Sequence, residues 1–95
     1  MHGDIQGRLA ETQRLAAEAT AEAVSENGEV RVVAGPGGEV KLIDLRIHAF
    51  ELSGFEIGEL TAATIKVAAA KADQALAASI RGLLGGFFEA ERQEP

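Results

Sequence analysis

The fold is decided by residues 28–53, which read GEVRVVAGPGGEVKLIDLRIHAFELS. Apolar and polar residues alternate over 29–34, a glycine-rich stretch follows at 35–38, and apolar residues return over 39–47. Alternation with a period of two is typical of a half-buried strand, and proline followed by glycines is typical of a turn. The segment therefore predicts a β-hairpin.

The second strand of this hairpin does not keep a simple alternation. Val40 and Leu42 share one parity, whereas Ile43, Leu45 and Ile47 share the other. A β-bulge near Leu42 would produce this shift, because a bulge adds one residue to one strand of a pair. Burial of both faces by a partner chain is the alternative, and we favour the bulge.

Helices are predicted on both sides of the hairpin. The first covers residues 4 to about 25, where apolar residues recur at spacings of three and four. The second begins at Gly54, because Ser53 and Glu56 have the spacing of a capping box. It is expected to end at the glycine pair 85–86.

Composition limits what a single copy of the chain can bury. A chain of 95 residues forms one domain, and 18 of its residues are alanine, which contribute little buried area. Open hairpin edges and narrow apolar helix seams need a partner. We therefore expect an α+β homodimer, helix–hairpin–helix in each subunit, with paired sheets and helical arms. Residues 1–88 form the expected domain, and 89–95 an acidic, disordered tail.

Several classes of function are disfavoured by composition. The chain has no cysteine, tryptophan or tyrosine, and no apolar run approaches the length of a membrane span. Its two histidines, His2 and His48, have no second ligand at metal spacing. The stretch 35–38 lacks the Lys-Ser/Thr pair of a phosphate-binding loop. We expect no metal, no cofactor, no membrane insertion and no enzymatic activity.

The order of these features resembles the YbaB/EbfC family of small bacterial nucleoid-associated proteins. The resemblance is carried by residues 28–38, 43–47 and 49–53, with Glu59, Leu60 and Ile65 beyond them. It implies a cytoplasmic homodimer whose small sheets join and whose helices project as paired arms. It also implies binding of double-stranded DNA at the nucleoid with little sequence specificity. Members usually carry a short extra strand before the hairpin. Residues 25–28 leave little room for it, so we expect it to be absent or fused into the first hairpin strand.

DNA binding requires basic side chains that neutralise phosphates. The candidates lie on the two helices: Arg8, Arg14, Lys66, Lys71 and Arg81. The candidates for the dimer interface are the large apolar residues of the hairpin and of the second helix: Val30, Val32, Leu42, Ile43, Leu45, Ile65, Leu76 and Ile80.

The net charge of −6 opposes DNA binding at long range. The alternative function is therefore an acidic, non-enzymatic dimer that docks another protein on the same fold and binds DNA weakly or not at all. The apolar pair Phe87-Phe88 is a further candidate for protein contact.

Overall fold

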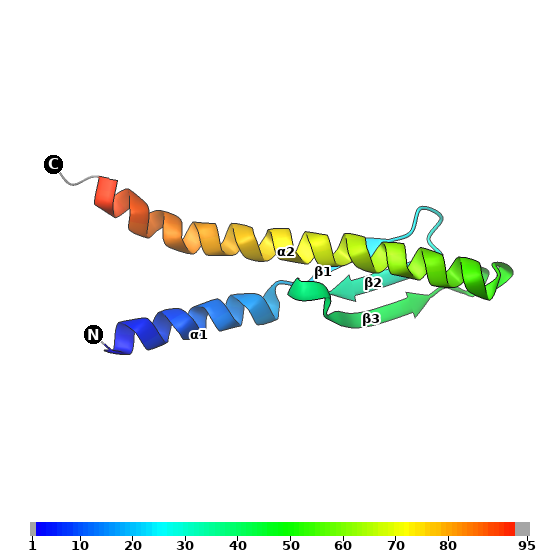
Figure 1. The fold of residues 1–95 in the computed structure, drawn as a ribbon, viewed down its shortest axis with the longest axis horizontal. Coiled ribbons are helices and arrows are strands. Elements are labelled where there is room, and N and C mark those ends of the chain that lie inside the picture. Colours follow the sequence, from blue (N-terminus) through cyan, green and yellow to red (C-terminus); the bar gives the residue numbers. More distant parts are fainter. Residues whose placement is uncertain (1, 93–95) are drawn as a thin grey trace.

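Two helices extend side by side from a small antiparallel sheet, and both chain ends lie at the end of the molecule opposite the sheet (Figure 1). The computed structural model describes residues 2–92, with side chains for 7–85. Its elements in chain order are α1 (His2–Glu18), β1 (Ala21–Val24), β2 (Val30–Ala34), the 3-10 turn η1 (Pro36–Gly38), β3 (Val40–Leu45), the 3-10 turn η2 (Ile47–Glu51) and α2 (Gly54–Arg92).

The sheet has the order β1-β2-β3, and both strand pairs are antiparallel. The predicted hairpin is β2–β3. Val33 pairs with Leu42 and Ala34 pairs with Val40, so Lys41 is the extra residue of a bulge. The bulge predicted near Leu42 is thus confirmed, and it lies at the preceding residue, Lys41. It accounts for the change of parity along β3, because an extra residue reverses which side chains share a face.

The core lies between α2 and the first two strands. Val30 and Val32 on β2 have no exposed surface, and they pack with Ala68 of α2. Small residues on α2 (Thr64, Ala68 and Ala72 are all buried) let the helix approach the sheet closely. This burial fixes α2 over β1 and β2, which leaves β3 outside the helix-covered area.

The predicted start of α2 is confirmed. The Glu56 amide donates to the Ser53 hydroxyl over 3.1 Å, and the Ser53 amide donates to the Glu56 carboxylate over 3.0 Å. This reciprocal pair is a capping box, which satisfies two amides that have no partner inside the helix. The long helix therefore begins at Gly54 as the sequence indicates.

The first helix is shorter than predicted. It ends at Glu18, and residues 21–24 form β1, so the expectation that the extra strand is absent or fused was wrong. The alanines of this segment favour a helix intrinsically. Pairing with β2 and burial of Ala23 in the core override that preference.

The second helix is longer than predicted. It has 39 residues and continues through Gly85 to Arg92, so the expected end at 85–86 was wrong. Glycine lowers helix stability but does not forbid helical angles. The expected tail 89–95 is helical up to Arg92, and residues 93–95 lie outside the described part of the chain, as do the side chains of Phe87 and Phe88.

Candidate nucleic-acid and subunit interfaces

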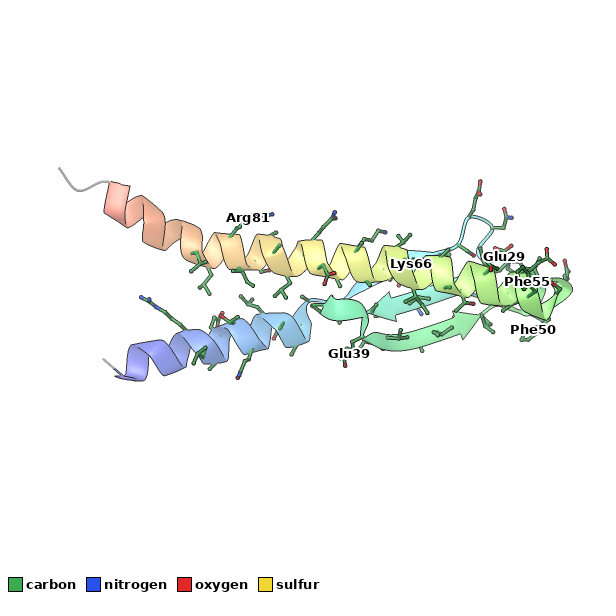
Figure 2. The ribbon with its side chains drawn as sticks, viewed as in Figure 1. Glu29, Glu39, Phe50, Phe55, Lys66 and Arg81 are labelled. Carbon is green, nitrogen blue, oxygen red and sulfur yellow. The ribbon has the colours of Figure 1, made fainter. Side chains whose placement is uncertain are left out.

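Lys66 and Arg81 are exposed cations on α2, about four helical turns apart. Within the part of the chain whose side chains are described, neither has a hydrogen bond or ion pair. Figure 2 shows Arg81 on the side of α2 that faces away from α1. Both ammonium and guanidinium groups are therefore available to a ligand that approaches the outer surface of α2.

Arg14 on α1 is engaged by its own helix. Its guanidinium forms ion pairs with Glu11, three residues earlier, and with Glu18, four residues later at 2.9 Å. The hydrogen bond from Arg14 holds the pKa of the Glu11 carboxyl below its usual value. The same contact raises the pKa of Arg14. Two carboxylates therefore compete with any phosphate for this side chain. Arg8 is exposed on the same helix.

Lys71 on α2 is engaged by the sheet. Its Nζ donates to the backbone carbonyl of Glu22 on β1 over 3.3 Å. The Glu22 carboxylate also pairs with Arg31 on β2 at 2.9 Å. Lys71 therefore serves the contact between α2 and β1. Of the five cations predicted for DNA contact, Lys66 and Arg81 are the two that the structure presents most openly on α2.

The predicted interface residues fall into three groups. Val30 and Val32 are 0% exposed and belong to the core of the subunit itself, so they have no surface to offer a partner. Half-buried residues on α2 form the second group: Ile65, Leu76 and Ile80. The third group is exposed on β3: Leu42, Ile43 and Leu45.

Strand β3 carries an apolar surface that the subunit does not cover. Its large apolar side chains are 37–45% exposed, and they include Val40, which sequence reasoning did not select. The register pairs Val40, Ile43 and Leu45 with residues of β2 that face α2, so these three share that face. The predicted bulge could have indicated Val40, because one extra residue in β3 places Val40 and Ile43 on the same face of the sheet.

The described residues contain no group of three or more His, Asp or Glu side chains that could hold a metal ion. His48 on η2 lies on the surface, and its Nε2 is 3.0 Å from the Asn27 carbonyl oxygen. This contact ties η2 to the turn between β1 and β2. None of the described helices is long and apolar enough to cross a membrane.

Comparison with known proteins identifies one family. The sequence model of the YbaB/EbfC DNA-binding family matches residues 2–87, which is nearly the whole chain. A search of curated proteins finds no match. The three-stranded sheet between two helices is consistent with the fold of this family.

Proposed function

Because the chain belongs to the YbaB/EbfC DNA-binding family, we propose that it is a homodimer that binds double-stranded DNA at the nucleoid, in the cytoplasm, with little sequence preference. Family membership is the observation that carries the proposal. The exposed cations on α2 support it, and we assign the contact to them.

We assign the main phosphate contacts to Lys66 and Arg81. Both are exposed on α2 and compete with no carboxylate within the described side chains. Lysine and arginine contacts to phosphate fix position but carry no sequence information. A surface of this kind therefore supports binding that depends weakly on base sequence. Arg8, Arg14 and Lys71 are assigned a secondary contribution.

We assign the dimer contact to the exposed strand β3, on which Val40, Ile43 and Leu45 share one face and Leu42 lies on the opposite face. These four large apolar side chains remain 37–45% exposed in an isolated subunit, and an unpaired strand edge lies beside them. Pairing two copies through this surface would bury the apolar groups and place two α2 helices in one particle. Ile65, Leu76 and Ile80 extend the same proposed interface along α2.

The alternative is a protein-interaction dimer that binds DNA weakly or not at all. The net charge of −6 per chain favours this alternative, because an acidic particle repels DNA at long range. The two functions predict different responses to salt, so one binding series separates them.

The test is a gel-shift titration with duplex DNA from about 20 to 200 mM salt, on the wild type and on Lys66→Gln and Arg81→Gln. Two phosphate contacts per subunit give about four per dimer, so affinity should fall by three to four orders of magnitude, roughly, over this range. Each substitution removes two contacts per dimer and should lower the salt slope by about two.

The matched control is Lys41→Gln, which changes the net charge equally but removes a lysine that already pairs with Glu39 on the sheet. Its salt slope should stay at the wild-type value. Absence of a shift at the lowest salt would favour the protein-interaction dimer. Equal losses for Lys41→Gln and Lys66→Gln would show that net charge, and not the surface of α2, governs binding.

A further inference from the structure

A second surface lies at the sheet end of the molecule. Two open cavities follow one flank of α2 and share Leu60 and Ala63. The larger, of about 420 Å³, is lined by Leu52 and Phe55 beside the start of α2. The smaller, of about 220 Å³, continues between Val67 of α2 and β1. Together they form one groove, which we call the head groove.

The apolar floor of the head groove is partly open to solvent. Phe55 is 78% exposed, although it is a large aromatic side chain at the edge of a cavity. Phe50 on η2 is also exposed, and Figure 2 places both rings at the end of the molecule where Glu29 lies. Exposed aromatic side chains beside an apolar cavity are typical of surfaces that anchor a partner.

The charged lining of the larger cavity is entirely acidic. Among the residues whose side chains are described, Glu29, Glu56 and Glu59 line it, and no lysine, arginine or histidine does. Glu29 is 8% exposed, and a backbone amide and the Ser25 hydroxyl bind its carboxylate, which lowers its pKa. The Ser53 amide and hydroxyl lower the pKa of Glu56 in the same way. Both groups are therefore ionised at neutral pH.

We propose that the head groove binds a basic segment of another protein, with an apolar side chain anchored beside Phe55 and lysine or arginine side chains paired with Glu56 and Glu59. Charge complementarity selects this occupant. Three carboxylates around one cavity repel phosphate, so DNA is disfavoured at this end of the molecule. A neutral apolar peptide would leave the carboxylates without counter-charges.

The described end of α2 does not fill the head groove of its own subunit. The helix α2 begins at the groove and runs for 39 residues to Arg92, a length of about 58 Å at 1.5 Å per residue. Residues near this end are also acidic (Glu89, Glu91 and Glu94), so their charge does not complement the carboxylates of the groove.

The proposed DNA contact at Arg81 and the larger cavity of the head groove lie far apart. Figure 2 shows Arg81 on the far arm of α2, whereas Glu29, Phe50 and Phe55 lie at the sheet end. Lys66 lies closer, beside Val67 of the smaller cavity. DNA at Arg81 and a protein segment anchored beside Phe55 can therefore be bound at the same time. Loss of one activity need not remove the other, and this permits a test that is independent of the proposed DNA binding.

The test uses two synthetic helical peptides of about 14 residues: one of leucine and lysine, and one of identical leucine pattern with glutamate in place of lysine. Binding is measured by fluorescence anisotropy and mapped by amide NMR shifts. The protein variants are Phe55→Ser, Glu59→Lys and the control Glu39→Lys. Glu39 is exposed at the other end of β3 and changes the net charge as much as Glu59 does.

The expected result is binding of the lysine peptide with shifts at Leu52, Phe55, Glu59 and Ala63, and no binding of the glutamate peptide. Phe55→Ser and Glu59→Lys should each weaken binding of the lysine peptide by about tenfold or more. This loss corresponds to one truncated anchor or one reversed charge pair. Glu39→Lys should leave its affinity within about twofold. DNA binding by Phe55→Ser should equal that of the wild type.

Three outcomes overturn the proposal. Equal weakening by Glu39→Lys and Glu59→Lys shows unspecific attraction to an acidic particle. Binding of the glutamate peptide as tightly as the lysine peptide removes the role of charge. Loss of the dimer in Phe55→Ser, measured by light scattering, shows that a second copy of this chain occupies the groove. Circular dichroism confirms that each variant retains its helix content before any of these conclusions is drawn.

Discussion

The Asp73 carboxylate on α2 accepts a hydrogen bond from the backbone amide of Gly37, at 2.9 Å, across 36 residues of sequence. Gly37 has a φ of 75° in the turn between β2 and β3. A non-glycine residue at this angle is strained, so the turn depends on glycine for its shape and on Asp73 for its attachment to the helix. The contact fixes the β2–β3 turn, and hence the start of β3, against α2.

Replacement of Asp73 should therefore destabilise the subunit although the residue lies on the surface. Asp73→Ala leaves the Gly37 amide without its partner and should lower the free energy of unfolding by about 1 kcal/mol. The neighbouring Gln74→Ala is the control, because Gln74 is exposed and alanine is a good helix former. Urea unfolding at fixed protein concentration measures both variants. Equal stability of the two would contradict an anchoring role for Asp73.

The capping box should contribute measurably to the stability of α2. Ser53→Ala removes the hydroxyl that accepts from the Glu56 amide and should cost about 1 kcal/mol. Ser79→Ala is the matched control, since Ser79 is exposed inside α2 and alanine there should be neutral or slightly stabilising. Thermal and urea unfolding of the pair give the difference. A cost at residue 79 as large as at residue 53 would refute the assignment.

Acid should weaken the fold partly through Glu56. The pKa of its carboxyl is lower in the folded chain than its usual value of 4.5, so its hydrogen bonds stabilise the fold above pH 4.5. That stabilisation is lost as the pH falls through the lowered folded pKa. Glu56→Gln can still accept from the Ser53 amide but does not titrate, so its urea midpoint should fall less below pH 4.5. Identical pH profiles would show that Glu56 has no part in acid unfolding.

The proposed dimer should depend on β3 and not on β1. Ile43→Glu places a carboxylate in the uncovered apolar surface of β3 and should convert the particle to a monomer of 9.9 kDa by light scattering. Val24→Glu on β1 makes the same change at a side chain of similar exposure, 48% against 42%, and should leave a dimer of twice that mass. Dissociation by Val24→Glu alone would move the proposed interface to the other edge of the sheet.

Cations that are already paired should matter less to DNA than open ones. Arg14 is bound by Glu11 and Glu18, whereas Lys66 has no such partner among the described side chains. Arg14→Gln should therefore weaken DNA binding less than Lys66→Gln does at the same salt concentration. Gel-shift affinities at low salt provide the comparison. A larger loss for Arg14→Gln would indicate that DNA displaces the two glutamates and lies along α1.

Local rules were sufficient where neighbouring residues decide the structure. The β2–β3 turn follows from proline and glycines at 35–38, and the start of α2 follows from Ser53 and Glu56. The bulge at Lys41 follows from the change of apolar parity along β3. Each of these signals acts over a few residues, so the sequence alone contains it.

Long-range contacts decided the parts that the sequence did not predict. Ala23 lies four residues after Ala19, which is helical spacing, yet β2 and α2 hold residues 21–24 as a strand. The pairing of Lys71 with the Glu22 carbonyl joins residues 49 positions apart. The sequence pattern therefore placed Lys71 among the candidates for DNA contact. It likewise placed Val30 and Val32 at a subunit interface, because it could not tell burial by α2 from burial by a partner.

The lysine contact at β1 also bears on how assembly stops. The Ser25 amide donates to the Val30 carbonyl, so the backbone polar groups of Ser25 point toward β2. Glu22 has the opposite parity on this strand, so its carbonyl points away from β2, outward from the edge of the sheet. Lys71 occupies that carbonyl, and a lysine across a strand edge discourages further strands from adding. A dimer joined along β3 would then expose only its two β1 edges, each of which Lys71 contacts. In the proposed dimer, the Lys71 ammonium group would therefore disfavour the addition of a further strand at β1.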